Sequence, residues 1–102
     1  LEHAEEDVMV RLAAEAKVEA QRVLHDLHKA LEVDAHLLEP GEREQIAAAE
    51  AKLLATLESN DHDRINLAIS DLDQASSAFA RRRMERAIQS ALRGHSVEEF
   101  GE

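Results

Sequence analysis

Hydrophobic residues recur along the chain three or four residues apart, the spacing of an α-helix, in three blocks. The first block, about 3–36, contains no Gly or Pro, which favours one long helix. Its second half carries a dense apolar stripe of Val23, Leu24, Leu27 and Leu31. In its first half the large apolar residues include Val8, Met9, Val10 and Leu12, and charged residues occupy most of the other positions. We expect that half to project from its bundle or to cover something outside this chain.

The second block predicts a helix over about 40–58. Pro40 disfavours helix in the residue before it but suits the first turn of a new helix, and Glu42 and Glu44 fall near the positive helix end. The predicted buried face consists of Ile46, Ala49, Leu53 and Leu57. The segment Ser59-Asn60-Asp61 has side chains that can end this helix and cap the next.

The third block predicts helix over 61–93, followed by Gly94, which suits the turn past a helix end. Its apolar stripe consists of Ile65, Ala68, Ile69, Leu72, Ala75, Phe79, Met84, Ile88, Ala91 and Leu92. The stripe shifts phase around 76–83, where Ser76 and Ser77 mark a kink or break near 76–80, so we expect one bent helix or two. For residues 95–102 we expect a flexible tail, although Ser96 and Glu99 have the spacing of a capping box.

Short connections between these helices favour antiparallel neighbours. The predicted fold is therefore all-α: a long projecting N-terminal helix whose C-terminal half packs with two or three further helices in a small antiparallel bundle. The chain has no Cys, Trp or Tyr. Disulfides and thiolate metal sites are thus excluded, and the stability must come from helix packing.

The formal net charge is -10, which argues against general binding to nucleic acid or to an anionic membrane surface. One short segment is basic, with Arg81, Arg82, Arg83, Arg86 and Arg93. We interpret these arginines as solvated or paired, with Glu85 within reach of Arg81 and Arg82. No apolar run is long enough for a transmembrane helix and the N-terminus is acidic, which predicts a cytoplasmic protein.

Candidate chemistry is sparse. His25 and His28 lie one helical turn apart, with His36 two turns further on, a spacing that allows two of them to share a metal. No further ligand is specified, so surface histidines are the favoured interpretation. The serines lack the setting of a nucleophile, and the carboxylates fall on exposed helix faces. We therefore expect no catalytic residue, metal or cofactor in this chain.

Three segments together resemble a known family: EEDVMVRLAAEAKVEAQRVL at 5–24, HLLEPGEREQI at 36–46, and FARRRMERAIQSALRGHSVEEF at 79–100. They are similar to the C-terminal helical lid of DnaK-type, heat-shock 70 kDa chaperones. Within that family they resemble the HscA branch, which serves iron–sulphur cluster assembly. The ending of the third segment is the most specific to that branch.

The resemblance implies that 1–94 is a lid subdomain preceded by an ATPase domain, which holds ATP and magnesium, and a peptide-binding β-sandwich. The lid's long helix would cover the sandwich and control how long a peptide stays bound. Val8 and Leu12 would form the contact surface to that domain. An iron–sulphur scaffold protein and a J-type cochaperone would be indirect partners, and the lid itself would hydrolyse nothing.

The resemblance also suggests a latch. His25 takes the place of a histidine that helps to fasten DnaK-type lids to loops of the sandwich. Gln21, one turn earlier, departs from the acidic residue of the family, although an amide can still hydrogen-bond.

An alternative hypothesis is an independent acidic helical adaptor that binds partner helices along 3–36. A lid would end a longer chain, whereas an adaptor would begin near Leu1, and the lack of an initiator Met at residue 1 favours the lid. Exposed apolar surface on the isolated chain also predicts a homodimer or exchange of the long helix between copies.

Overall fold

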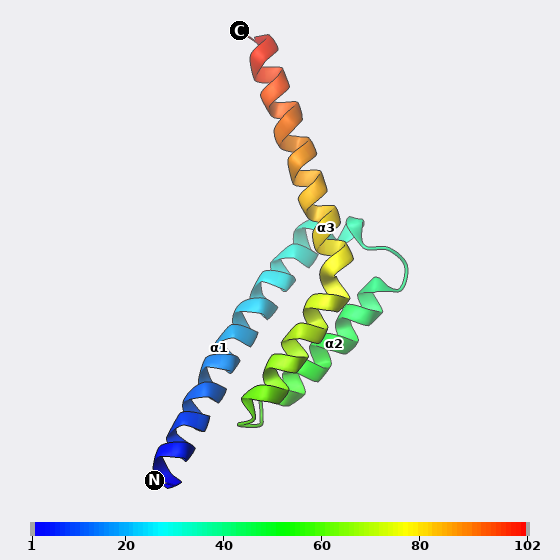
Figure 1. The fold of residues 1–102 in the computed structure, drawn as a ribbon. Helices are drawn as coiled ribbons and strands as arrows, with labels where there is room; N and C mark the ends of the chain where they lie inside the picture. The colour runs from blue at the N-terminus through cyan, green and yellow to red at the C-terminus, as the bar shows by residue number, and fades with distance from the viewer. Residues whose placement is uncertain (1, 102) are drawn as a thin grey trace.

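A computed structural model describes the backbone of residues 2–101 and the side chains of residues 6–93. The elements are α1 (Glu2–Asp34), the short 3₁₀ helix η1 (Ala35–Leu37), α2 (Glu42–Thr56) and α3 (His62–Gly101). No strand occurs in the described backbone, so the predicted all-α class is confirmed. The molecule is elongated, about 68 Å in its longest dimension, with the termini at opposite ends (Figure 1).

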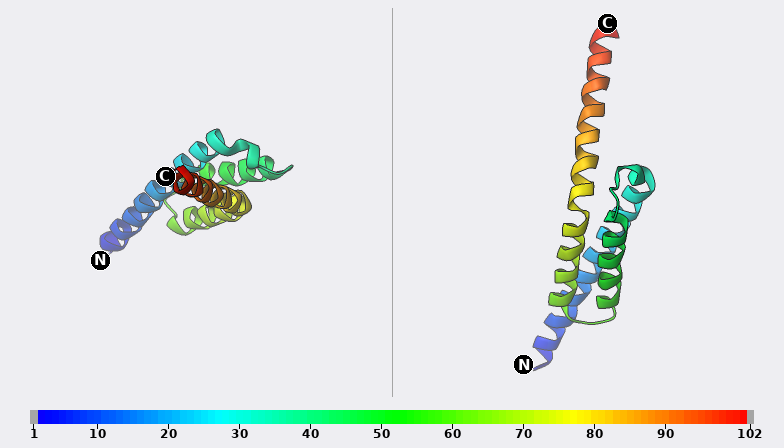
Figure 2. Two further views of the ribbon diagram at one scale, coloured as in Figure 1. Left: turned by 90° about the horizontal axis from the view of Figure 1, so that it is seen from above. Right: turned by 90° about the vertical axis from the view of Figure 1, so that its right-hand side faces the viewer.

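The core lies where the three helices run side by side. α3 packs against both α1 and α2, and the views along and across the bundle show α3 beside both of them (Figure 2). α1 contributes a buried seam that is rich in small side chains: Ala13, Ala16, Ala20, Leu24, Leu27 and Ala30. Val23 and Leu31, which were predicted in the buried stripe, are only partly buried at its edge. The buried face of α1 thus begins at Ala13, well before the predicted stripe that starts at Val23, because small alanines rather than large apolar residues form its first part.

α2 begins two residues later than predicted, after a turn at Pro40 and Gly41. Gly41 has φ 88°, a left-handed conformation that glycine adopts without steric cost. The backbone N–H of Glu39 donates to Glu42 Oε1 at 2.8 Å, so a side chain of the first helical turn reaches back across the connection. Ile46, Ala49 and Leu53 are buried as predicted.

α3 begins with the predicted cap. Asp61 Oδ1 accepts hydrogen bonds from the backbone N–H groups of Asp63 at 3.1 Å and Arg64 at 3.3 Å. These bonds satisfy two of the amides that lack partners at a helix start. The buried residues of α3 are Ile65, Ala68, Ile69, Leu72 and Phe79.

The predicted kink or break near 76–80 falls within one continuous α3. The hydroxyl of Ser76 donates to the carbonyl of Leu72 at 2.8 Å, and that of Ser77 to the carbonyl of Gln74 at 2.9 Å. Such bonds to the preceding turn often bend a helix. α3 changes direction above this region, where its colour turns from yellow to orange (Figure 1).

Beyond the bend, α3 leaves the bundle, and we call residues 81–93 the α3 arm. The predicted stripe is not buried there: Met84, Ile88 and Leu92 are 65%, 53% and 61% exposed. The reason is geometric, because Ile88 follows the buried Phe79 by nine residues, which is about half a turn at 3.6 residues per turn. In an unbroken helix the shifted stripe therefore faces away from the core.

The segment predicted as a flexible tail, 95–102, continues α3 as far as Gly101. The side chains of residues 94–102 lie outside the described part of the structure, as does the capping box of Ser96 and Glu99.

Candidate functional site

The N-terminal part of α1 extends past the ends of α2 and α3 (Figure 1), and we call residues 6–12 the α1 arm. Its large apolar side chains are accessible to solvent. Val8 is 42%, Met9 48%, Val10 57% and Leu12 36% exposed. The arm remains helical although the bundle does not reach it, so its apolar surface is available to a partner.

Gln21 and His25, the predicted latch residues, lie one turn apart on an exposed face of α1. Neither forms a hydrogen bond or ion pair with the side chains that the structure describes. Leu12 and Gln21 are nine residues apart, which places them about half a turn apart around the helix axis. Val8 and Leu12 therefore lie on one flank of the buried alanine seam, and Gln21 and His25 lie on the other.

Three of the five arginines fasten the α3 arm to the connection between α1 and α2. Arg82 Nε donates to the carbonyl oxygen of Leu37 at 2.7 Å. The same guanidinium contacts Glu39 Oε1 at 3.3 Å and forms an ion pair with Glu42. Arg83 Nε donates to Asp34 Oδ2 at 2.8 Å, and Arg86 contacts the Nε2 atom of His36. The predicted pairing of the arginines is thus confirmed for these residues, but the acidic partner is not Glu85.

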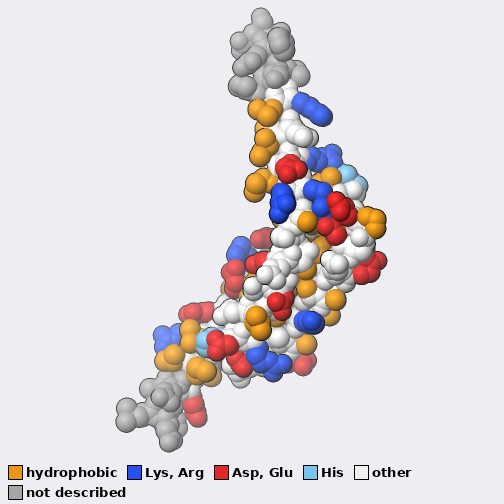
Figure 3. All heavy atoms as spheres, turned by 45° about the vertical axis from the view of Figure 1, so that its right-hand side comes forward, with side chains coloured by type: hydrophobic (Ala, Val, Ile, Leu, Met, Phe, Trp, Pro, Cys, Tyr) orange, Lys and Arg blue, Asp and Glu red, His pale blue; other side chains and the backbone are white. Residues whose placement is uncertain are grey.

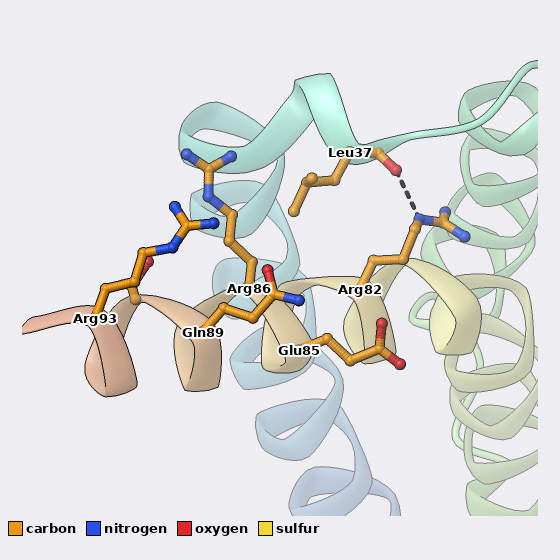
Figure 4. A pocket seen from close by; sticks show the side chains of 7 residues that line it. Leu37, Arg82, Glu85, Arg86, Gln89 and Arg93 are labelled. Atoms are coloured by element: carbon orange, nitrogen blue, oxygen red, sulfur yellow. Dashed lines mark hydrogen bonds between the residues drawn. The ribbon is translucent and has the colours of Figure 1, made fainter. Parts of the chain in front are cut away.

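A groove of about 410 Å³ lies between η1 and the α3 arm. Its lining residues are Leu37, Arg82, Glu85, Arg86, Gln89, Ser90 and Arg93. In Figure 4 the side chains of Arg82 and Arg86 extend from α3 towards η1, and the dashed line joins Arg82 to Leu37. Since both arginines already contact groups of this chain, the groove is a charged packing boundary between two segments.

The histidines are dispersed. His28 Nε2 pairs with Glu50 on α2, His36 contacts Arg86, and His25 faces solvent. Among the described side chains, no group of three or more His, Asp or Glu residues is placed to hold a metal ion. The described helices also include none that is long and apolar enough to cross a membrane.

Among the described side chains, one carboxylate has a clearly perturbed pKa. Arg22 donates to Glu19 from Nε at 3.1 Å and from a terminal nitrogen at 2.5 Å, one turn apart on α1. These hydrogen bonds, and the positive charge of Arg22, lower the pKa of Glu19 below its ordinary value, and they raise the pKa of Arg22. The pair lies on the solvent side of α1, where oppositely charged side chains three residues apart stabilise the helix.

Residues 1–85 match the family model described as Hsp70 protein, which covers α1, η1, α2 and the bundled part of α3. The chain belongs to the Hsp70 family. It is also 46% identical over 99 residues to proteins named "Chaperone protein HscA" from two Escherichia coli strains and from Shigella boydii. The family resemblance of the three quoted segments is thereby confirmed.

These alignments cover 97% of this chain but 16% of each relative. The chain therefore spans about a sixth of the length of the curated relatives that it matches. The contacts of Arg82 with Leu37, Glu39 and Glu42 could not be predicted from the sequence. Their separation of 40 residues or more along the chain leaves no local signal.

Proposed function

We propose that this chain is the helical lid of an HscA-like chaperone, which covers the peptide-binding domain of the same parent chain and sets how long a bound peptide stays. The observation that carries this proposal is the α1 arm, a helical extension with four exposed large apolar side chains and no partner helix of its own. Its support comes from the Hsp70 family match and the HscA relatives.

The surface on the arm is large enough to matter for closure. Complete burial of a Val, Leu or Met side chain is worth about 1.5–3 kcal/mol. Val8, Met9, Val10 and Leu12 are 36% to 57% exposed, so between a third and a little over half of that contribution is still to be gained at each. Val10 follows Val8 by two residues and so faces nearly the opposite side of the helix. A domain on the side of Val8 can therefore gain about 2–4 kcal/mol from Val8, Met9 and Leu12, before the entropy of closing is subtracted.

The two flanks of α1 have different roles in this proposal. A domain that covers Val8 and Leu12 approaches one flank of the alanine seam, whereas Gln21 and His25 lie on the other. Contact with both sets requires either a bend in α1 between Leu12 and Gln21 or loops of the domain that reach around the helix. We assign the main contact to the arm and a secondary latch to His25, with Gln21 as a hydrogen-bonding neighbour.

The chemistry of the parent chaperone lies elsewhere in this proposal. An ATPase domain with ATP and magnesium would drive opening and closing, and the lid would be non-catalytic. A role in iron–sulphur cluster biogenesis follows from the HscA branch, with an iron–sulphur scaffold protein as client and a J-type cochaperone as indirect partner.

Substitution of Val8 and Leu12 by Ser in the full-length chaperone tests the lid role. We expect faster release of a fluorescent peptide in the closed state, because the arm loses apolar contact area. The isolated 102-residue chain should melt almost unchanged, because both side chains lie outside its core. Leu67→Ser is the matched control, since Leu67 is 64% exposed on the bundled part of α3. Unchanged release, or a large loss of stability in the isolated chain, would count against the proposal.

His25→Ala and Gln21→Ala, made separately, test the latch. An increase in release with His25→Ala that is smaller than that of the arm variant would agree with a secondary contact. No effect of either substitution would remove the latch from the proposal and leave the arm contact standing.

The alternative of an independent adaptor is distinguished by the mass of the native protein. An antibody against these 102 residues should detect a single band several times heavier than 11.4 kDa in source-cell extract. A band near 11.4 kDa would refute the lid and direct attention to helical partners of α1.

A further inference from the structure

We propose that Met9 on the α1 arm is a site of reversible oxidation, where a hydroperoxide weakens the contact between this chain and the peptide-binding domain. The inference rests on the proposed function, because it concerns the regulation of the arm contact. The thioether of Met9 supplies apolar contact area, whereas its sulfoxide is polar. Oxidation therefore shortens the time for which a bound peptide stays.

Both sulfur atoms of the chain lie in side chains that reach solvent. The sequence contains two Met and no Cys. Met9 is 48% exposed and Met84 is 65% exposed, whereas the buried residues of the described part are Ala, Leu, Ile and Phe. Figure 3 shows hydrophobic side chains along the left edge of the α3 arm and again on the α1 arm at the lower left. A dissolved peroxide can thus reach both thioethers while the bundle stays folded.

Met9 continues the buried face of α1 beyond the bundle. It precedes Ala13 by four residues and Ala16 by seven, so the three side chains lie on one face of the helix. Ala13 and Ala16 are buried, whereas about half of the Met9 side chain is accessible to solvent. In the proposed closed lid, the peptide-binding domain covers Met9 together with Val8 and Leu12.

The oxidation is a two-electron step with a hydroperoxide as the oxidant. A lone pair of the Met9 sulfur attacks one peroxide oxygen, and the S–O bond forms as the O–O bond breaks. With hydrogen peroxide, the departing hydroxide takes the proton from the sulfur-bound oxygen and leaves as water. Sulfur loses two electrons, and the peroxide gains them. Methionine sulfoxide reductases restore the thioether, so the change is reversible.

The sulfoxide of Met9 weakens the arm contact because closure then has to bury a polar group. Its oxygen is hydrated in the open lid, and burial of that oxygen against apolar surface is unfavourable without a hydrogen-bond donor. We expect release of a bound peptide to become about 3- to 10-fold faster. Met84 lies on the α3 arm, on the far side of the bundle from the α1 arm (Figure 1), so its oxidation should leave release unchanged.

The first measurement compares the oxidation of Met9 and Met84 in the full-length chaperone, by mass spectrometry after a brief exposure to hydrogen peroxide. The open state is prepared with ATP, and the closed state with ADP and a bound peptide. We expect Met9 to be oxidised several-fold more slowly in the closed state, because the domain covers its sulfur. Met84 should be oxidised at the same rate in both states and is the internal control.

The second measurement is the release of a fluorescent peptide after oxidation in the open state. Met84→Leu leaves Met9 as the oxidisable residue of this chain, and Met9→Leu is the matched control that retains Met84. Leu stays apolar, has a similar volume and takes up no oxygen from peroxide. Both variants keep every other methionine of the parent chain. Oxidation should accelerate release in Met84→Leu but not in Met9→Leu, and methionine sulfoxide reductase should restore the original rate.

The outcomes separate this inference from the lid function. If Met9 is protected in the closed state but its oxidation leaves release unchanged, the lid contact stands and the redox control is overturned. Equal acceleration in Met9→Leu would assign the effect to another methionine and also overturn the inference. Equal oxidation of Met9 in the open and closed states would contradict the lid contact itself, and the redox control with it.

Discussion

Arg82→Ala should destabilise the isolated chain, because Arg82 joins the α3 arm to the connection between α1 and α2. Its guanidinium donates to the carbonyl of Leu37 and pairs with Glu39 and Glu42. The side chain of Arg82 is 25% exposed and that of Glu42 is 15% exposed, so this pair is partly shielded from water. Glu39 is 66% exposed, and its contact is screened by solvent.

The expected loss follows from these contacts. A hydrogen bond to a charged group contributes about 1.5–3 kcal/mol when it is shielded, and an exposed ion pair contributes about 0–1 kcal/mol. After the substitution, water can hydrate the carbonyl and carboxylates that lose their partner, so the loss is smaller than the sum of the separate contacts. We therefore expect the free energy of unfolding to fall by about 2–3 kcal/mol. For a chain of about 100 residues, that loss lowers the Tm by roughly 8–20 °C.

Thermal melts followed by circular dichroism, at several protein concentrations, measure this loss and separate it from association. Arg81→Ala is the control, because the side chain of Arg81 is exposed and has no partner among the described residues. Its free energy of unfolding should change by less than about 0.5 kcal/mol. Arg82→Lys should fall between the two, since Lys keeps the charge but lacks the planar fork. Equal stability of Arg82→Ala and Arg81→Ala would refute the reasoning.

Three further substitutions test other parts of the fold. Leu53→Ala should lower the free energy of unfolding in urea by about 2–5 kcal/mol, because Leu53 is fully buried. Leu67→Ala, at an exposed position, should lower it by less than about 0.5 kcal/mol, and similar losses at both positions would contradict the assignment of Leu53 to the core. Asp61→Ala should cost about 1 kcal/mol in the same assay through loss of the α3 cap, and an unchanged midpoint would show that the cap is dispensable. Arg22→Gln should raise the pKa of Glu19, which Arg22 now holds below its ordinary value, in a titration followed by carboxyl NMR signals. Because the folded pKa is the lower one, the stabilising contribution is present above the unfolded pKa of Glu19 and is lost as the pH falls through the folded pKa; an unchanged pKa in the variant would exclude the pairing.

The helices were predictable because local signals agree with the tertiary structure. The uninterrupted first block became α1, Pro40 and Gly41 mark the turn before α2, and Asp61 caps α3 as its position predicted. The exposure of Val8 and Leu12 was also predictable, because charged residues surround them in the sequence.

Other features depend on distant parts of the chain. The phase shift at 76–83 was visible, but the exposure of Ile88 depends on whether the helix breaks there, and periodicity does not decide that. The contacts of Arg82 join residues at least 40 positions apart. The opposite orientation of Leu12 and Gln21 becomes meaningful only once α1 is known to run between them without interruption.

The continuity of α1 makes it a rigid lever. Thirty-three helical residues correspond to about 50 Å at 1.5 Å per residue. A rotation of about 20° at one end of such a rod moves the other end by roughly 17 Å, as long as the helical hydrogen bonds hold. Small angular changes where α1 meets another body therefore become large displacements of the bundle. Any such movement therefore pivots outside α1. A pivot within α1 would require helical hydrogen bonds to break.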